Sequence, residues 1–141
     1  MEIKPVDPEF GRVWHRVTQA EGEALIPEGI FAAAIQGELG RLSRYWGLGF
    51  VSPARECARR VAQLRRVAFF LEGTIAPAQP TQPVSGPAKE LLRGLFLAEG
   101  AAEQRYRSLA AGMTDPILAR ALYHCADSCA RTRQFLWQAV K

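Results

Sequence analysis

Two glutamate and tyrosine pairs with identical spacing are the first candidates for chemistry. Glu38 precedes Tyr45 by seven residues, and Glu99 precedes Tyr106 by the same interval. This interval is about two helical turns, so each pair would lie on one face of a helix. The residues one turn to either side are apolar, namely Ile35, Leu42, Leu95 and Ala102. The pattern predicts two carboxylates in a helical interior; a solvated helix face is the alternative.

A second repeated group combines cysteine with arginine. Glu56-Cys57-Ala58-Arg59 and Ser128-Cys129-Ala130-Arg131 are each followed five residues later by leucine, at Leu64 and Leu136. Cys125 and Cys129 are four residues apart on one helix face, which would suit a soft metal or a redox pair, although small buried cysteines commonly only fill space. Together the two repeats indicate that the chain contains two copies of one helical hairpin.

The elements that must position these residues are all helical. Helical periodicity and stop signals predict helices over residues 29–48, 52–73, 88–111 and 116 to the end, in the last of which Asp115-Pro116 provides the start. Residues 74–87 contain four prolines and no charge, so they predict an extended connection between two hairpins, 29–73 and 88–141. Residues 1–28 predict a short amphipathic helix. We expect a single all-α domain.

Composition and charge argue against several classes of protein. The chain has 18 basic and 14 acidic residues, a net charge of +4, and no Lys/Arg run longer than two, so a nucleic-acid partner is not favoured. No segment has the roughly 18 apolar residues that span a bilayer, and no signal peptide is evident. The three cysteines, Cys57, Cys125 and Cys129, do not suit a disulfide framework. These features predict a cytoplasmic protein without a membrane partner.

The hairpin repeat resembles the ferritin-like superfamily, in particular its small rubrerythrin-like members, over about residues 29–140. The resemblance implies a four-helix bundle with one long crossover between its second and third helices. It also implies a di-iron or di-manganese site made from two single Glu residues and two Glu-x-x-His motifs. By position, Glu38 and Glu99 match the single Glu ligands, and Glu56 matches the Glu of the first motif.

The remaining ligand positions depart from that pattern. Arg59 and Arg131 stand where the two histidines are expected, and Ser128 stands where the second motif requires Glu. A shift of one residue in the first motif would place Cys57 and Arg60 at its positions, again without histidine. Arginine stays protonated and is not a practical ligand at neutral pH. A normal two-metal site therefore cannot form, and we expect no cofactor, or iron or manganese if a reduced site works.

Buried carboxylates that have lost their metal need another positive partner. We therefore predict that Arg59 and Arg131 reach inward and form a salt-bridge cluster with Glu38 and Glu99. Tyr45 and Tyr106 are expected to hydrogen-bond a polar group in the same interior.

Three functions follow from these residues. The first is a non-catalytic binding or structural module with a broken di-metal site, self-associating as a dimer through apolar residues such as Trp14, Trp46 and Trp137. The second is a metal-binding oxidoreductase or metal-storage protein with a reduced site of Glu38, Glu56 and Glu99, aided by His124 or Asp127. The third is a module that binds an acidic partner or nucleic acid through the arginines of one helix, Arg55, Arg59, Arg60, Arg65 and Arg66.

Overall fold

The computed structural model describes residues 26, 29–73 and 86–140, and these form four helices without a strand. The helices are α2 (Ile30–Gly47), α3 (Val51–Glu72), α4 (Ala88–Ala111) and α5 (Pro116–Ala139). This confirms the all-α prediction. The expected N-terminal helix, Trp14 and most of the 74–87 connection lie outside the described residues.

Helix boundaries follow local chemistry. The Asp115 carboxylate accepts hydrogen bonds from the backbone N–H groups of Ile117 and Leu118, at 2.9 and 3.2 Å, and Pro116 occupies the first helical turn, as its fixed φ favours. Gly73 ends α3 with a φ of 74°, which glycine adopts without steric cost. The helix predicted over residues 52–73 begins one residue earlier, at Val51, and Phe50 is its N-cap without a side-chain hydrogen bond.

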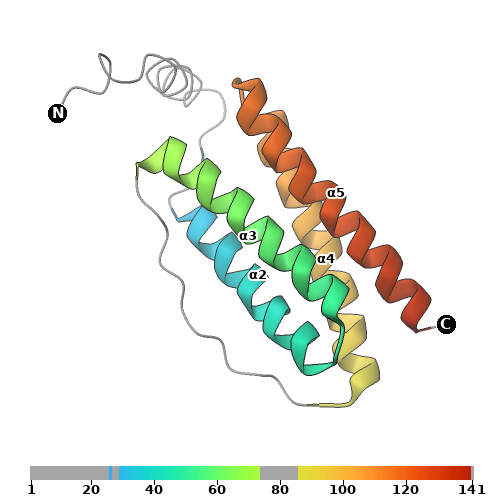
Figure 1. Ribbon diagram of the computed structural model, residues 1–141. Coiled ribbons are helices and arrows are strands. Elements are labelled where there is room, and N and C mark those ends of the chain that lie inside the picture. The colour runs from blue at the N-terminus through green and yellow to red at the C-terminus, as the bar shows by residue number, and fades with distance from the viewer. Residues whose placement is uncertain (1–25, 27–28, 74–85, 141) are drawn as a thin grey trace.

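The four helices form two antiparallel hairpins that pack against each other (Figure 1). Helix α2 pairs with α3, α4 pairs with α5, and the hairpins meet most closely between α3 and α5. The end of α3 and the start of α4 lie at opposite ends of the bundle, so α3 and α4 run in the same direction. A four-helix arrangement of this kind needs one long crossover between its second and third helices.

One core draws on all four helices. Its largest cluster includes Phe31 and Ile35 of α2, Leu64 of α3, Tyr106 of α4 and Leu122 of α5. A second cluster surrounds Tyr45, Cys57, Leu95 and Leu136 nearer the end where α5 finishes. Within the described part of the chain, no helix is long and apolar enough to cross a membrane.

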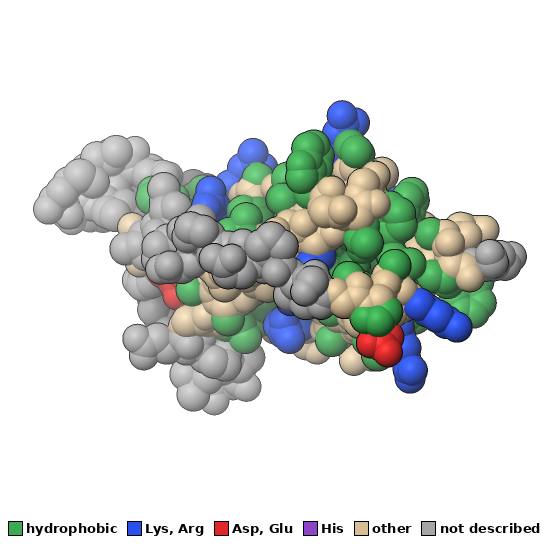
Figure 2. All heavy atoms as spheres, turned by 90° about the horizontal axis from the view of Figure 1, so that it is seen from below, with side chains coloured by type: hydrophobic (Ala, Val, Ile, Leu, Met, Phe, Trp, Pro, Cys, Tyr) green, Lys and Arg blue, Asp and Glu red, His purple; other side chains and the backbone are tan. Residues whose placement is uncertain are grey.

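Exposed apolar side chains concentrate at that same end. The exposed residues lie at the end of α2, at the start of α3 and at the end of α5, and they are Trp46, Val51, Phe135, Trp137 and Val140. Seen from this end, hydrophobic side chains lie open on the surface, with Lys and Arg side chains around them (Figure 2). This surface is called the apolar end below.

Candidate functional site: a buried ionic core

Glu38 and Glu99 converge inside the bundle, as the sequence predicted. Both are fully buried, Glu38 on α2 and Glu99 on α4. Each carboxylate accepts a hydrogen bond from a tyrosine of the other hairpin. The Tyr45 hydroxyl donates to Glu99 at 2.7 Å, and the Tyr106 hydroxyl donates to Glu38 at 2.5 Å. The expected polar partners of both tyrosines are therefore the two glutamates, in a crossed arrangement.

Arg60 of α3 lies between the two carboxylates. Its Nε donates to both oxygens of Glu38 at 2.9 and 3.0 Å, and its Nη2 lies 3.0 Å from both oxygens of Glu99. The other hydrogen bonds of the guanidinium go to Ser128 and Thr132 through Nη1, at 2.8 and 3.3 Å, and to the Cys57 thiol through Nη2, at 3.2 Å. Arg60 is only 1% exposed, and every nitrogen of its guanidinium has a partner.

A second arginine, Arg41 of α2, completes the charge balance. Its Nη2 lies 2.7 Å from Glu38 and its Nε lies 3.4 Å from Glu99. Neither nitrogen meets hydrogen-bond geometry, so these contacts are ionic. Two buried guanidinium groups thus face two buried carboxylates. We call this group, Glu38, Arg41, Arg60 and Glu99, the ionic core.

Burial and charge oppose each other in the ionic core. Burial alone would lower the pKa of Arg60, but the charges of Glu38 and Glu99 outweigh it, and the pKa lies above its usual range. The same balance raises the pKa of Arg41. Burial, followed by the nearby carboxylate, raises the pKa of Tyr45 and of Tyr106. Both arginines therefore stay charged and both tyrosines stay neutral, which fixes the direction of every hydrogen bond.

The prediction that Arg59 and Arg131 neutralise Glu38 and Glu99 is wrong. Their side chains are 71% and 64% exposed, and both pair with Glu56, at 2.7 and 3.1 Å. The reason is helical phase: on α3, Cys57, Arg60 and Leu64 face the interior, whereas Glu56 and Arg59 lie toward its edge. Arg60 and Arg41 take the role that was predicted for Arg59 and Arg131.

The other predicted site residues do not join the ionic core. Glu56 accepts hydrogen bonds from the Ser128 hydroxyl at 2.6 Å and from Arg131. Burial would raise the pKa of Glu56, but these hydrogen bonds and the charges of Arg131 and Arg59 lower it overall. His124 is exposed on α5, and Asp127 pairs with Arg107 at 3.2 Å. The reduced site of three glutamates and His124 is therefore not assembled.

The interior cysteines mark the positions that the repeat makes equivalent. Cys57 and Cys129 are fully buried, and Arg60 and Thr132 follow them by three residues on α3 and α5. Cys125, one turn before Cys129, is buried as well. Burial raises the pKa of all three thiols, that of Cys125 to about 12, so they remain protonated. Protonated buried thiols are poor nucleophiles and poor metal ligands.

The residues present do not fit a pair of metal ions. The carboxylates that would bind them already accept hydrogen bonds from Arg60 and the tyrosines, and a guanidinium occupies the space between them. Among the described residues, no three His, Cys, Asp or Glu side chains are grouped so that they could hold a metal ion.

Comparison with known proteins gives no relative: no family model, no curated protein and no solved structure matches this chain.

Proposed function

We propose that the protein is a ferritin-like helical module in which the ionic core takes the place of a di-metal centre, and that it acts as a non-catalytic structural or binding protein. The observation that carries this proposal is the position of Arg60, whose guanidinium hydrogen-bonds Glu38 and Glu99 at once. A guanidinium supplies fixed positive charge and N–H donors to carboxylates, but it offers no open coordination position and no redox chemistry.

The helical phase of α3 and α5 supports the ferritin-like assignment in a corrected register. Counted from the interior positions, the two motifs that would carry Glu-x-x-His read Cys57-x-x-Arg60 and Cys129-x-x-Thr132. All four side chains are buried, and they stand opposite Glu38 and Glu99 of the other two helices. In this register both motifs have lost both ligands.

Two experiments test the proposal. Metal analysis of protein from cells grown with added iron and manganese should find substoichiometric metal, and two bound ions per chain would contradict the non-metal function. The variant C57E/R60H/C129E/T132H restores both motifs and should bind about two divalent ions per chain. The matched variant E56Q/R59H/R131H changes only residues outside the ionic core and should not. A restored variant that folds but stays metal-free would argue against the ferritin-like origin.

Self-association is part of the proposal. The apolar end exposes two tryptophans, Trp46 at 66% and Trp137 at 56%, and exposed apolar surface of this kind is typical of protein contacts. Trp14, the third tryptophan assigned to an interface, lies outside the described residues.

A further inference from the structure

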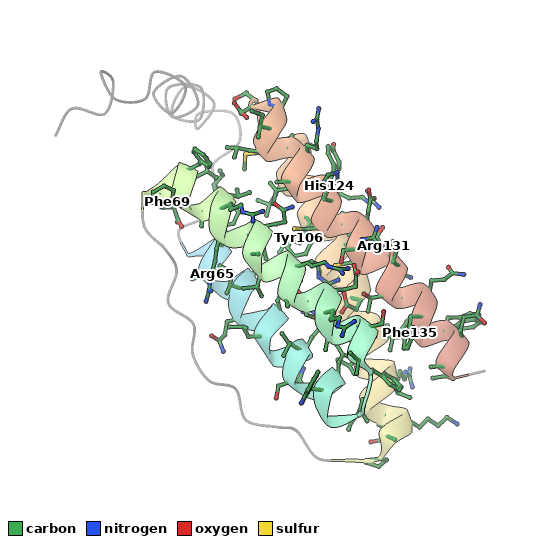
Figure 3. The ribbon with its side chains drawn as sticks, viewed as in Figure 1. Arg65, Phe69, Tyr106, His124, Arg131 and Phe135 are labelled. Atoms are coloured by element: carbon green, nitrogen blue, oxygen red, sulfur yellow. The ribbon has the colours of Figure 1, made fainter. Side chains whose placement is uncertain are left out.

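A polar hollow of about 320 Å³ opens between α3 and α5, beside the ionic core. Its walls carry charged and polar side chains from both helices, namely Glu56, Arg59 and Gln63 of α3 and His124, Asp127 and Arg131 of α5. Arg60 and Ser128, both buried, also line it. His124 and Arg131 lie along α5 about two turns apart (Figure 3). The volume is at the lower end of the range for small-molecule sites.

The two arginines at the rim keep most of their hydrogen-bonding capacity. Arg59 uses Nη1 and Arg131 uses Nη2 to contact the two different oxygens of Glu56. A guanidinium has five N–H donors, so each arginine retains donors that can meet a ligand. Glu56 thereby fixes the two guanidinium groups on either side of the hollow, one from each helix.

The charge around the hollow is positive after internal pairs are removed. Arg60 is neutralised within the ionic core, and Asp127 is paired with Arg107. Arg59 and Arg131 then face the single carboxylate of Glu56, which leaves one positive charge. The Ser128 hydroxyl also donates to that carboxylate, which leaves both of its oxygens occupied by protein donors.

We propose that this hollow binds the phosphate group of a small phosphorylated molecule, held between Arg59 and Arg131 with His124 on the same wall. Guanidinium groups match the oxygen geometry of phosphate and bind it through paired, charge-assisted hydrogen bonds. A polynucleotide carries the same group, but a hollow set between two helices suits a free small molecule better than an extended backbone. The inference stands on surface side chains of α3 and α5, so it holds whether or not the bundle is ferritin-like.

The test is to titrate the isotope-labelled full chain with inorganic phosphate and, separately, with a hexose monophosphate at constant ionic strength. Binding is monitored by NMR. Backbone shifts should move in residues 55–63 and 124–131. Arg59→Gln and Arg131→Gln should each weaken binding about tenfold or more, the loss expected for a charged hydrogen bond. Arg105→Gln, which removes an exposed arginine of α4 outside the hollow, should leave binding unchanged.

Three results would overturn the inference. Potassium chloride could reproduce the shifts at equal concentration, or Arg105→Gln could weaken binding as much as Arg131→Gln, and either would reveal general charge attraction. A duplex oligonucleotide could bind with steep salt dependence while both small probes fail, which would assign the surface to a polyanion. Both hollow variants change exposed side chains, and their circular dichroism melts should match the unmodified chain.

Discussion

Removing the charge of Arg60 tests the ionic core most directly. Arg60→Met keeps the aliphatic stem and most of the volume, so it removes the guanidinium without opening a large cavity. Glu38 and Glu99 would then share Arg41 alone, whose contacts lack hydrogen-bond geometry. The variant leaves two buried carboxylates facing one cation. It also removes the hydrogen bonds that Arg60 donates to Ser128, Thr132 and Cys57.

The expected cost is large for a chain of this size. Breaking a buried ion pair by removing one partner costs roughly 3 to 5 kcal/mol, because the remaining charge is left uncompensated. The total stability of a domain is about 5 to 15 kcal/mol, so Arg60→Met should lower the urea midpoint severely. Arg131→Met is the matched control: its side chain is 64% exposed, and loss of such a surface pair costs under about 1 kcal/mol.

A second substitution separates charge from packing. Arg60→Met combined with Glu99→Gln leaves Glu38 facing Arg41 at 2.7 Å, one charge against one. The double variant should therefore be more stable than Arg60→Met alone, even though it carries more changes. Urea unfolding monitored by circular dichroism gives the free energy of unfolding of the unmodified chain, Arg60→Met, Arg131→Met and the double variant. The reasoning is refuted if Arg60→Met unfolds within about 1 kcal/mol of Arg131→Met, or if Glu99→Gln only adds to the damage.

Other predictions concern pH, the crossed tyrosines and assembly. Burial raises the pKa of Cys57, Cys125 and Cys129, so these thiols stabilise the fold fully below their unfolded value near pH 8.5 and lose that contribution as pH rises. Near pH 9 the three thiols, ionised mostly in the unfolded chain, should lower the free energy of unfolding by about 3 kcal/mol per pH unit, and Cys125→Ser should reduce that slope by about a third. Above about pH 10 the buried hydroxyls of Tyr45 and Tyr106, whose pKa is also raised, add to the slope. Tyr45→Phe should cost about 2 kcal/mol in thermal melts, because it removes a hydrogen bond to a buried carboxylate; an unchanged melting temperature would contradict the crossed arrangement. Trp137→Glu should halve the mass in sedimentation equilibrium if the apolar end is a dimer interface, whereas Ile117→Glu at the opposite end should not.

The fold was largely predictable because its signals are local. Proline and glycine punctuation and helical periodicity give the four helices to within one or two residues, including the Asp115 cap. The matched spacing of Glu38 with Tyr45 and of Glu99 with Tyr106 also predicted that two carboxylates face inward, and both are fully buried. These inferences need only residue type and spacing along one helix.

The prediction of the site failed where it required knowing, to within one residue, which side of α3 faces the interior. Matching Glu56 to the Glu of the family motif put Arg59 inside and left Arg60 as the alternative. The apolar residues indicate the correct phase. Leu64 is four residues after Arg60 and seven after Cys57, which places all three on one helix face. Arg41 was missed altogether. Its position three residues after Glu38 suggests a surface pair, and only the approach of Glu99 from another helix draws it into the interior.

The crossed tyrosines bear on how the chain folds. Tyr45 and Glu99 are 54 residues apart in sequence, and Tyr106 and Glu38 are 68 apart. While the first hairpin emerges during synthesis, Arg60 can already meet Glu38, but Tyr45 has no carboxylate until α4 exists, and Glu38 lacks its tyrosine until the same helix is made. Contacts so distant in sequence slow folding, because the loop must close before they contribute. We therefore expect neither hairpin to hold its tyrosine and glutamate in place alone, and the two halves to become ordered in a single late step.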